Sequence, residues 1–308
     1  MIKYVGVRLA TAIPTMLVVI AASFFLLRAA PGGPFDTDRT LTADVEANLN
    51  ARYGLDLPLH EQFSRYVGGL FQGDFGPSFR YKDVQVSEII ADQLPISLTI
   101  GFLAFLFTLV VGISLGVIAA LNQNSRLDYV ISGGTAIGVA VPSFVSAPIL
   151  AMIFGVIWGI LPVAGWGGGH PAHLVLPVIA LGIPNAAYVA RLMRGSMLEN
   201  LSADYIRTAR AKGLREKLIL RRHVIPPALL PVISYLGPAT AAILTGSVVI
   251  EKIFALPGTG LAFVDGALNR DYTLVLGLVI VYAGLVILLN LITDVLYGFL
   301  DPRLRVNP

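Results

Sequence analysis

The chain has 308 residues, of which 56% are hydrophobic and only 13% are charged, and its mean hydropathy is +0.76. A soluble domain carries about a quarter charged residues, so this composition indicates a membrane protein. The absence of cysteine excludes a disulfide framework and a thiolate site, and the small net charge of +3, gathered in one loop, argues against a nucleic-acid partner.

The first apolar segment, residues 9–27, predicts a transmembrane helix at about 9–29 with a kink at Pro14. Lys3 and Arg8 precede it, as basic residues do in a signal peptide. No small-residue cleavage site follows cleanly, and the apolar run is long enough to span the membrane. We therefore expect an uncleaved first span.

A hydrophilic region follows from about residue 31 to residue 93, with ten acidic against five basic residues between Asp36 and Asp92. Apolar residues recur at helical spacing over 45–53, with Thr42 as the expected cap, and over 59–70 after Pro58. Both stretches predict short amphipathic helices packed on the membrane domain. The acidic balance favours an external location.

Five more apolar segments predict transmembrane helices: 94–121, 130–157, 173–193, 229–250 and 272–293. Prolines inside three of them predict kinks that face protein or a water-filled path: Pro142, Pro148, Pro177, Pro184 and Pro238. Two glycine pairs predict close helix approach: Gly112 with Gly116, and Gly134 with Gly138. Six spans put both termini on one side of the membrane.

The most charged segment lies between the fourth and fifth predicted spans, with nine Lys or Arg and three acidic residues over 191–222. Because basic residues accumulate in cytosolic loops, we expect this loop and both termini to face the cytosol. Ser202 is expected to cap a short helix that ends in a left-handed turn at Gly213. The residues expected on one face of this helix are Tyr205, Ala209 and Lys212. A second short helix is expected over 215–223.

A motif in this loop carries a resemblance. Arg207-Thr208-Ala209, then Gly213, then His223-Val224-Ile225-Pro226, resembles the Glu-Ala-Ala…Gly…Ile-x-Leu-Pro loop of ABC importer permeases. Arg207 and His223 depart from that general motif in the manner of the oligopeptide, dipeptide and nickel permease branch. Further matching strings lie at 30–32, 73–78, 141–144, 194–197, 268–272 and 300–303. The plain alternative is a positively charged cytosolic loop that binds nothing.

The resemblance implies an all-α, polytopic membrane protein with six transmembrane helices and the type I ABC importer permease fold. It implies three parts: the N-terminal span with its external loop region (1–93), a permease core of five spans with a cytosolic coupling loop at 194–228 (94–297), and a cytosolic tail (298–308). It also implies a bacterial cytoplasmic membrane location, with both termini cytosolic.

The implied partners are a homologous second permease subunit, two cytosolic ATPase subunits, an extracytoplasmic peptide-binding protein and membrane lipid. The sequence has no Walker A pattern, so we expect the ATPase subunits to bind the ATP and this chain to hold no cofactor and to be no enzyme. His170 and His173 lack a third ligand in the sequence, so we expect no metal site.

Two sets of functional residues are implied. The expected ATPase-coupling residues are Asp204, Tyr205, Arg207, Thr208, Ala209, Arg210, Lys212, Gly213 and Pro226. The second set follows the fifth span, where residues 251–260 form either a simple external turn or a re-entrant element near the external gate. The resemblance favours the gate, with Glu251, Pro257, Gly258 and Gly260 as candidates.

Other functions stay open. Within the family, oligopeptides are the expected substrate, and dipeptides, nickel or another small solute are alternatives. A secondary transporter driven by an ion gradient would need charged residues at the bilayer midplane and an internal repeat, whereas these spans are almost uncharged. A third alternative is a membrane scaffold that transports nothing, in which the helix kinks at these prolines would have no role.

Overall fold

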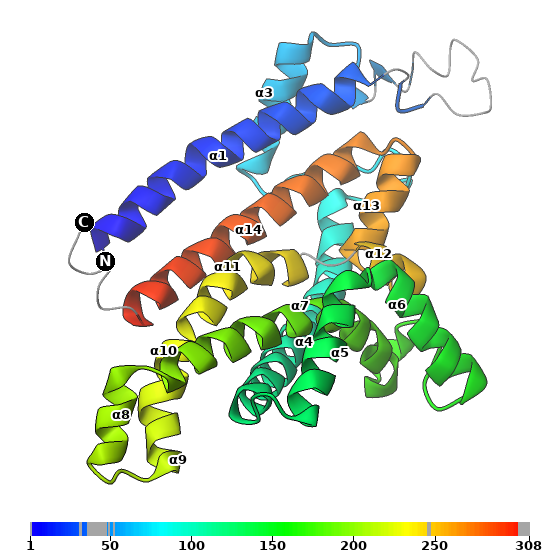
Figure 1. The fold of residues 1–308 in the computed structure, drawn as a ribbon. Coiled ribbons are helices and arrows are strands. Elements are labelled where there is room, and N and C mark those ends of the chain that lie inside the picture. The colour runs from blue at the N-terminus through cyan, green and yellow to red at the C-terminus, as the bar shows by residue number, and fades with distance from the viewer. Residues whose placement is uncertain are drawn as a thin grey trace.

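The computed structural model describes residues 2–30, 33–35, 48, 50–51, 53–244 and 248–300 (Figure 1). Within these ranges every regular element is helical, and one isolated β-bridge pairs Pro77 with Gln85. The helix predicted over 45–53 and the tail predicted over 298–308 lie largely outside the described residues.

The long helices are α1 (Ile2–Ala29), α4 (Val86–Leu121), α7 (Pro171–Leu201) and α14 (Tyr272–Leu300). The shorter ones are α3 (Leu59–Leu70), α5 (Arg126–Ala140), α6 (Ser143–Leu150), α8 (Asp204–Ala211), α9 (Glu216–Ile219), α10 (Ile225–Ala228), α11 (Leu230–Leu244), α12 (Val248–Ile253) and α13 (Thr259–Leu268). Two π-helical segments, Ala151–Ile157 and Leu220–Val224, and a 3₁₀ turn, Gly167–Gly169, complete the described elements.

Four helices are long and apolar enough to cross a membrane: α1, α4, α7 and α14. Two bent helix pairs, 126–157 and 216–243, bring the number of spans to six if each pair counts as one. When each bent pair is counted as one span, the predicted number of six spans is confirmed. The second span starts at Val86 and not at residue 94, because the polar first turns around Glu88 and Asp92 continue the same helix.

The third span is not the single helix predicted over 130–157. The chain bends by 108° between Arg126–Ala140 and Ser143–Ile157. Pro142 causes the break, since a proline has no N–H for the helix and forces the preceding residue out of helical geometry. Val141 accordingly has an extended backbone, with φ −85° and ψ 117°.

Glycines allow α4 and α5 to approach α7 closely. A β-carbon on Gly112 would lie 2.8 Å from the carbonyl oxygen of Ala186, and one on Gly116 would lie 2.6 Å from Cβ of Met193. Gly138 likewise faces Ala187, at 2.9 Å between the two β-carbons. The predicted close approach of helices is therefore confirmed at these three glycines. It is wrong for Gly134, where a β-carbon would meet open space.

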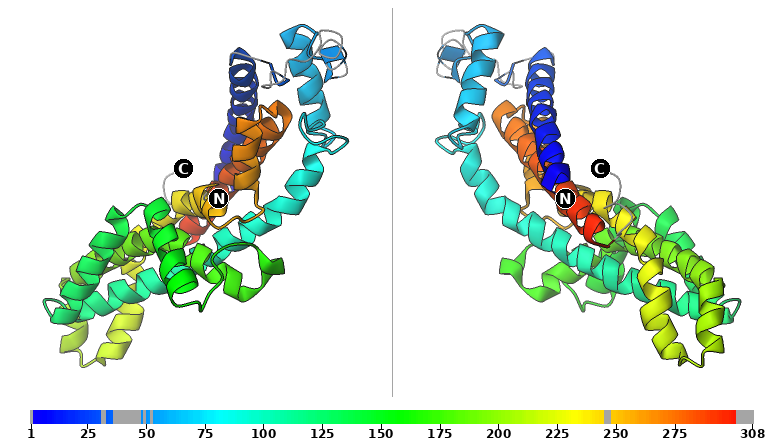
Figure 2. Two further views of the ribbon diagram at one scale, coloured as in Figure 1. Left: turned by 90° about the vertical axis from the view of Figure 1, so that its right-hand side faces the viewer. Right: turned by 90° about the vertical axis from the view of Figure 1, so that its left-hand side faces the viewer.

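The molecule is elongated, with α3 at one end and the α8–α9 hairpin at the other (Figure 2). The predicted packing of α3 on the membrane helices is confirmed. Phe63 packs against Phe24 of α1 with ring centroids 5.2 Å apart, and Arg28 Nε donates a 2.8 Å hydrogen bond to Gln62. Helices α1 and α14 run antiparallel, so α1 begins where α14 ends (Figure 1).

Candidate functional site

The predicted coupling loop forms a helical hairpin that projects from the ends of α7 and α10 (Figure 1). Its first helix, α8, begins at Asp204, and Ala203 occupies the capping position without a side-chain hydrogen bond. The cap predicted at Ser202 is wrong. Ser202 instead ends α7 with helical backbone angles, and its hydroxyl donates to the Glu199 carbonyl at 2.9 Å.

The predicted left-handed turn at Gly213 is confirmed, with φ +73°. The Gly213 N–H donates to the Arg210 carbonyl at 2.9 Å, and the Leu214 N–H donates to the Ala209 carbonyl at 3.3 Å. This pair of bonds is a Schellman motif, which satisfies carbonyls that a helix end would leave unpaired. The motif fixes the direction in which the chain leaves α8.

The buried face of α8 differs from the prediction. Ile206 and Ala209 are buried, whereas Tyr205 and Lys212 are exposed. Ile206 lies three residues from Ala209 and is fully apolar, so it takes the inner position. These two residues join one hydrophobic cluster with residues of α7, α9, α10 and α11, among them Met193, Met197, Ile219, Ala228 and Val232. The hairpin is therefore packed onto the two helices that flank it in the chain.

In addition to the hydrophobic cluster, hydrogen bonds of Tyr205 hold the hairpin to the ends of the neighbouring helices. Its hydroxyl lies 2.6 Å from Oδ1 of Asn200 and 3.4 Å from the carbonyl oxygen of His223. Pro227 has no N–H to supply the helical bond to that carbonyl, so the tyrosine contacts an acceptor that the helix leaves open. Burial, with the nearby Glu199 carboxylate, raises the pKa of Tyr205, so the hydroxyl keeps its proton at neutral pH.

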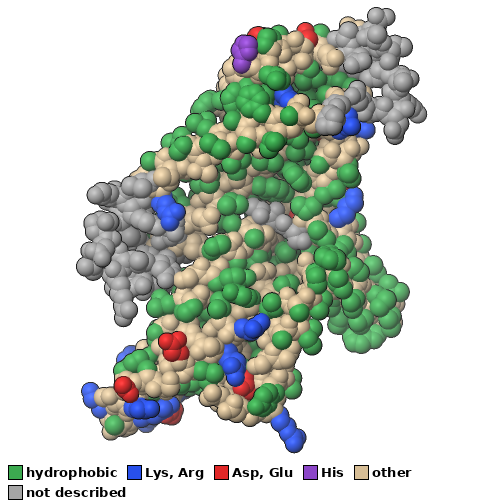
Figure 3. Space-filling view, turned by 45° about the horizontal axis from the view of Figure 1, so that its top comes forward, with side chains coloured by type: hydrophobic (Ala, Val, Ile, Leu, Met, Phe, Trp, Pro, Cys, Tyr) green, Lys and Arg blue, Asp and Glu red, His purple; other side chains and the backbone are tan. Residues whose placement is uncertain are grey.

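The end of the hairpin, residues 210–218, is exposed at every position, and we call it the basic tip. Figure 3 shows Lys and Arg side chains gathered at this end of the molecule. Arg210 and Glu216 form an ion pair of 2.7 Å across the tip, while Leu214 and Leu218 are each 37% exposed among the charges. The basic tip therefore presents apolar side chains among charged ones.

All but one of the predicted coupling residues are exposed in the structure. The exposed ones are Asp204, Tyr205, Arg207, Thr208, Arg210, Lys212, Gly213 and Pro226, and the buried one is Ala209. Ile206, Ile219 and Val224, which hold the hairpin to the core, were missed. Their apolar character at helical spacing was the available signal.

The second predicted set, the candidates for the external gate, contains a buried carboxylate, that of Glu251. Glu251 is 2% exposed, and its Oε2 accepts hydrogen bonds from the backbone N–H groups of Gly260 at 2.8 Å and Leu261 at 3.2 Å. These N–H groups belong to the first turn of α13, so Glu251 caps that helix from outside. A β-carbon added to Gly258 would lie 2.4 Å from Oε2 of Glu251, and one added to Gly260 would lie 2.8 Å from the same oxygen. Both glycines are therefore required for this approach. Pro257 lies in the exposed turn before them.

A serine from a distant helix completes this cluster. Ser97 of α4 is buried, and its hydroxyl oxygen lies 2.9 Å from both the backbone nitrogen and the hydroxyl of Thr259. The segment is also held to the loop before α7, because the Gly165 N–H donates to the Phe254 carbonyl at 2.7 Å. Ser97 was missed because a lone serine in an apolar span gives no signal of its partner.

Two of the strings that carry the family resemblance, 73–78 and 268–272, meet at the end of the molecule where α13 joins α14. Asp271 is fully buried and accepts hydrogen bonds from the Ser78 hydroxyl, from the Phe79 N–H at 3.1 Å and from the Thr273 hydroxyl at 3.0 Å. The same Thr273 hydroxyl oxygen lies 2.7 Å from the Pro77 carbonyl oxygen, so its one proton is shared between these two acceptors. The segment 73–83 is thereby fixed over the turn between α13 and α14.

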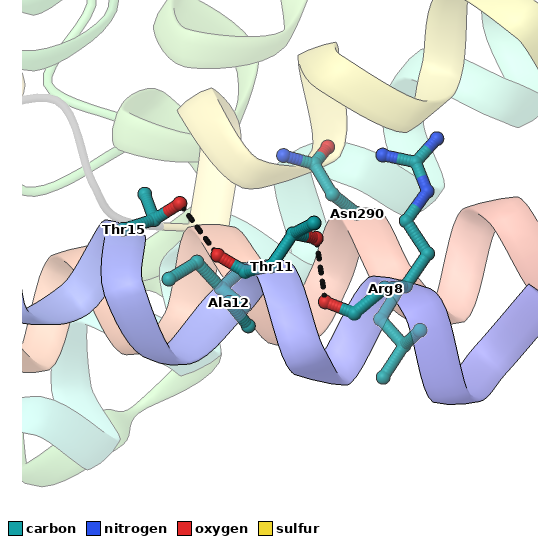
Figure 4. A pocket seen from close by; sticks show the side chains of 7 residues that line it. Arg8, Thr11, Ala12, Thr15 and Asn290 are labelled. Carbon is teal, nitrogen blue, oxygen red and sulfur yellow. Dashed lines mark hydrogen bonds between the residues drawn. The ribbon is translucent and has the colours of Figure 1, made fainter.

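A pocket of about 160 Å³ lies between α1 and α14 (Figure 4). Its lining residues are Arg8, Thr11, Ala12, Thr15, Ile287, Asn290 and Leu291. The Thr11 hydroxyl donates to the Arg8 carbonyl at 2.9 Å and the Thr15 hydroxyl to the Thr11 carbonyl at 2.8 Å. Ligand pockets usually exceed about 300 Å³, so this one is small for a peptide, and its helices differ from those of both candidate sites.

Comparison with known proteins gives consistent matches along the chain. The family described as "Binding-protein-dependent transport system inner membrane component" matches residues 112–306. The family described as "Binding-prot-dependent transport system membrane comp, N-term" matches residues 1–101.

Several curated relatives cover almost the whole chain. It is 51% identical over 305 residues to the oligopeptide transport system permease protein OppB of Haemophilus influenzae, covering 99% of this chain and 100% of that protein. It is 50% identical to OppB of Escherichia coli K12 with the same coverage. It is 40% identical over 307 residues to the dipeptide transport system permease protein DppB of Bacillus subtilis, covering 100% and 99%.

Among solved structures, an inward-facing conformation of the MetNI methionine ABC transporter matches with a TM-score of 0.59. The match has 19% sequence identity and covers 69% of this chain and 96% of that chain, so it speaks for the fold alone. The chain therefore belongs to the family of inner membrane components of binding-protein-dependent transport systems, and its fold is that of the type I ABC importer permeases.

Proposed function

We propose that this chain is one of two membrane-spanning subunits of an ATP-driven importer that carries oligopeptides across the bacterial cytoplasmic membrane. The observation that carries the proposal is the α8–α9 hairpin, which exposes a basic tip to a partner while its inner face packs on the membrane helices. The substrate class rests on the relatives named for oligopeptide transport at 51% and 50% identity. Dipeptides are the second candidate, because a relative named for dipeptide transport is 40% identical.

In this function the ATPase subunits contact the hairpin. The proposed contacts come from the exposed members of the coupling set, Asp204, Tyr205, Arg207, Thr208, Arg210, Lys212, Gly213 and Pro226, and Ala209 holds the helix beneath them. Movement of the tip would reach α7 and α11 through the cluster that contains Ile206 and Ile219. Because packed cores shift as units, a short helix can transmit a domain movement to whole spans.

The other partners follow the same proposal. A homologous second permease completes the path through the membrane, and an extracytoplasmic binding protein delivers the peptide at the α3 end. The basic tip lies at the opposite end, so we place it, together with both termini, in the cytosol. We assign residues 1–93 to the external part, 94–297 to the core and 298–308 to the tail, with α4 running from the first part into the second.

Glu251, Pro257, Gly258 and Gly260 are proposed as part of the external gate. The buried cap on α13 supports this assignment, because it makes the segment 251–260 a rigid element that must move with its neighbours. A simple surface turn would not need a buried carboxylate, whose desolvation is costly.

Reconstitution tests the function. The chain is placed in liposomes with its second permease, both ATPases and the binding protein, and uptake of radiolabelled trialanine is measured. Uptake should require internal ATP and should survive ionophores that collapse the proton and sodium gradients. Uptake that follows a gradient and ignores ATP would show a secondary transporter.

Uptake of dialanine in preference to trialanine would assign the dipeptide function. The purified chain alone should not hydrolyse ATP. Hydrolysis that follows this single subunit through mutation and repurification would contradict the assignment.

A further inference from the structure

The faces that α7 and α11 leave exposed differ from the other exposed faces of the long helices. Along α1 and α4 the exposed positions carry large apolar side chains: Ile13, Leu17, Val18, Leu26, Phe102 and Val110. On α11 the exposed residues that the structure describes are Pro231, Ser234, Pro238 and Ala242. Spacings of three and four put these residues on one face of the helix. This face carries small side chains and one hydroxyl, and it lacks the large apolar side chains exposed on α1 and α4.

The corresponding face of α7 also lacks large aliphatic side chains. Pro184, Tyr188, Arg191 and Gly195 recur at spacings of four, three and four residues, and the last three are exposed. Tyr188 is 40% exposed, and it lies thirteen residues before the end of α7, or about 20 Å along the helix. Tyr188 is thus near the middle of the α7 helix, Pro171–Leu201, and five residues before the end of the span predicted over 173–193.

Three side chains bring the two faces together, and we call them the tyrosine ledge: Asn185, Tyr188 and Tyr235. The rings of Tyr188 and Tyr235 have centroids 4.3 Å apart, and the Tyr235 hydroxyl donates to Oδ1 of Asn185 at 2.9 Å. Among the described residues, the Tyr188 hydroxyl has no hydrogen-bond partner. The ledge therefore offers one open hydroxyl beside a stacked aromatic surface.

Two prolines also remove the usual helical donors of backbone carbonyls near the ledge. Pro238 has no N–H to close the helical hydrogen bond to the Ser234 carbonyl, and Pro184 has none for the Ala180 carbonyl. In lipid such groups must find another partner. Ser234 is exposed on the face that adjoins the ledge, so a water-filled or substrate-filled path would satisfy this requirement.

We propose that the tyrosine ledge lines the translocation path and binds the backbone amides of the passing peptide, which rests on the proposed function above. An extended peptide carries an unpaired donor and acceptor at each residue, whereas a neighbouring transmembrane helix has closed its own backbone bonds. The open Tyr188 hydroxyl and the freed carbonyl suit the peptide. Recognition of this kind reads the main chain and tolerates any side chain.

The variant Tyr188→Phe tests the proposal, because it removes the hydroxyl and keeps the ring that stacks on Tyr235. ATP-driven uptake of radiolabelled trialanine by the reconstituted complex should show a KM raised about three- to tenfold, the effect of losing one hydrogen bond. Tyr129→Phe is the matched control, since Tyr129 is a 68% exposed tyrosine on α5, away from the ledge. Its KM should equal that of the wild type.

Photocrosslinking gives a second measurement that needs no change in affinity. p-Benzoyl-phenylalanine is introduced at position 188 or 129, and the complex is illuminated during trialanine uptake. Peptide label should appear on the chain from position 188 and not from position 129. Crosslinks from position 188 to the second permease without peptide label would overturn the proposal and assign the face to a subunit contact.

The two proposals fail in different ways. If the wild-type complex imports trialanine with ATP, yet Tyr188→Phe has a normal KM and position 188 takes no label, then only the ledge is wrong. If the wild-type complex imports no peptide, the proposed function fails, and the ledge fails with it.

Discussion

Asp128 at the start of α5 and Arg194 near the end of α7 are joined by two hydrogen bonds. Arg194 Nε lies 2.6 Å from Oδ1 of Asp128, and Nη2 lies 2.8 Å from Oδ2. The buried Asp128 carboxylate also accepts from the Asn124 N–H at 2.9 Å and the Ser132 hydroxyl at 3.3 Å. This bidentate pair holds α5 to α7 about two turns before the hairpin begins.

We predict that Asp128→Ala lowers the thermal unfolding temperature of the detergent-solubilised complex. The change leaves the Arg194 guanidinium, the Asn124 N–H and the Ser132 hydroxyl without their shared acceptor. Asp128→Asn retains one oxygen acceptor and should fall between the alanine variant and the wild type. Arg126→Ala, at an exposed position two residues away, is the control. Equal unfolding temperatures for all four proteins would show that the pair contributes nothing.

Gly213 provides a test of the hairpin geometry. A β-carbon there would meet no atom within 4 Å, so a substitution acts through the backbone alone. With φ at +73°, a side chain costs about 1–2 kcal/mol, most for a β-branched residue. Gly213→Val should insert normally but lose ATPase subunits or turn over ATP without uptake, and Gly213→Asn should be milder. Both are measured at matched permease levels. If Val supports wild-type transport, the hairpin is a plain connector.

Gly258 tests the buried cap on α13. Its backbone is extended, with φ −101°, but a β-carbon would lie 2.4 Å from Oε2 of Glu251. Gly258→Ala should therefore displace the carboxylate and destabilise the complex by about 1–3 kcal/mol, measured by thermal unfolding. Glu251→Gln keeps an acceptor for the Gly260 N–H and should cost less than Glu251→Ala. Gly195→Ala, in an open helical position, should be neutral. A neutral Gly258→Ala would argue against the cap.

The glycine pairs give a matched comparison within the membrane. Gly116→Ala would put a β-carbon 2.6 Å from Cβ of Met193, so α4 and α7 must separate, at about 1–3 kcal/mol. Gly134→Ala meets open space and should be neutral or stabilising, since alanine favours a helix by about 1 kcal/mol. Heat-induced aggregation of the solubilised chain distinguishes the two. Equal losses for both variants would contradict the packing of α4 on α7.

The sequence predicted those features that local chemistry decides. The spans follow from apolar length, because a chain in lipid must close its own hydrogen bonds. The turn at Gly213 follows from the left-handed backbone that glycine alone adopts freely. The cap at Ser202 failed because the preceding helix, α7, extends to Leu201 and uses that serine for its own end.

Features that depend on tertiary packing were not predictable in this way. Asp128 and Arg194 lie 66 residues apart, and only the packing of α5 on α7 brings them together. The same holds for Ser97 and Thr259, which are 162 residues apart. Pro142 indicated a kink, but the 108° bend is set by where the following helix packs. A single polar residue in an apolar span does not indicate which residue it will contact.

The π-helical segment Leu220–Val224 connects the hairpin to α10. A π-turn holds one residue more than an α-turn, and each residue of an α-helix rotates the chain by about 100°. The longer π-turn and the α-turn cover about the same rotation, so deleting one residue here would restore an α-turn and leave the tip facing nearly the same way, while α11 stayed in place. The chain can therefore lose the extra residue of this π-turn with little change in the surface that the basic tip presents, so the length of this connection and the orientation of the tip are set separately.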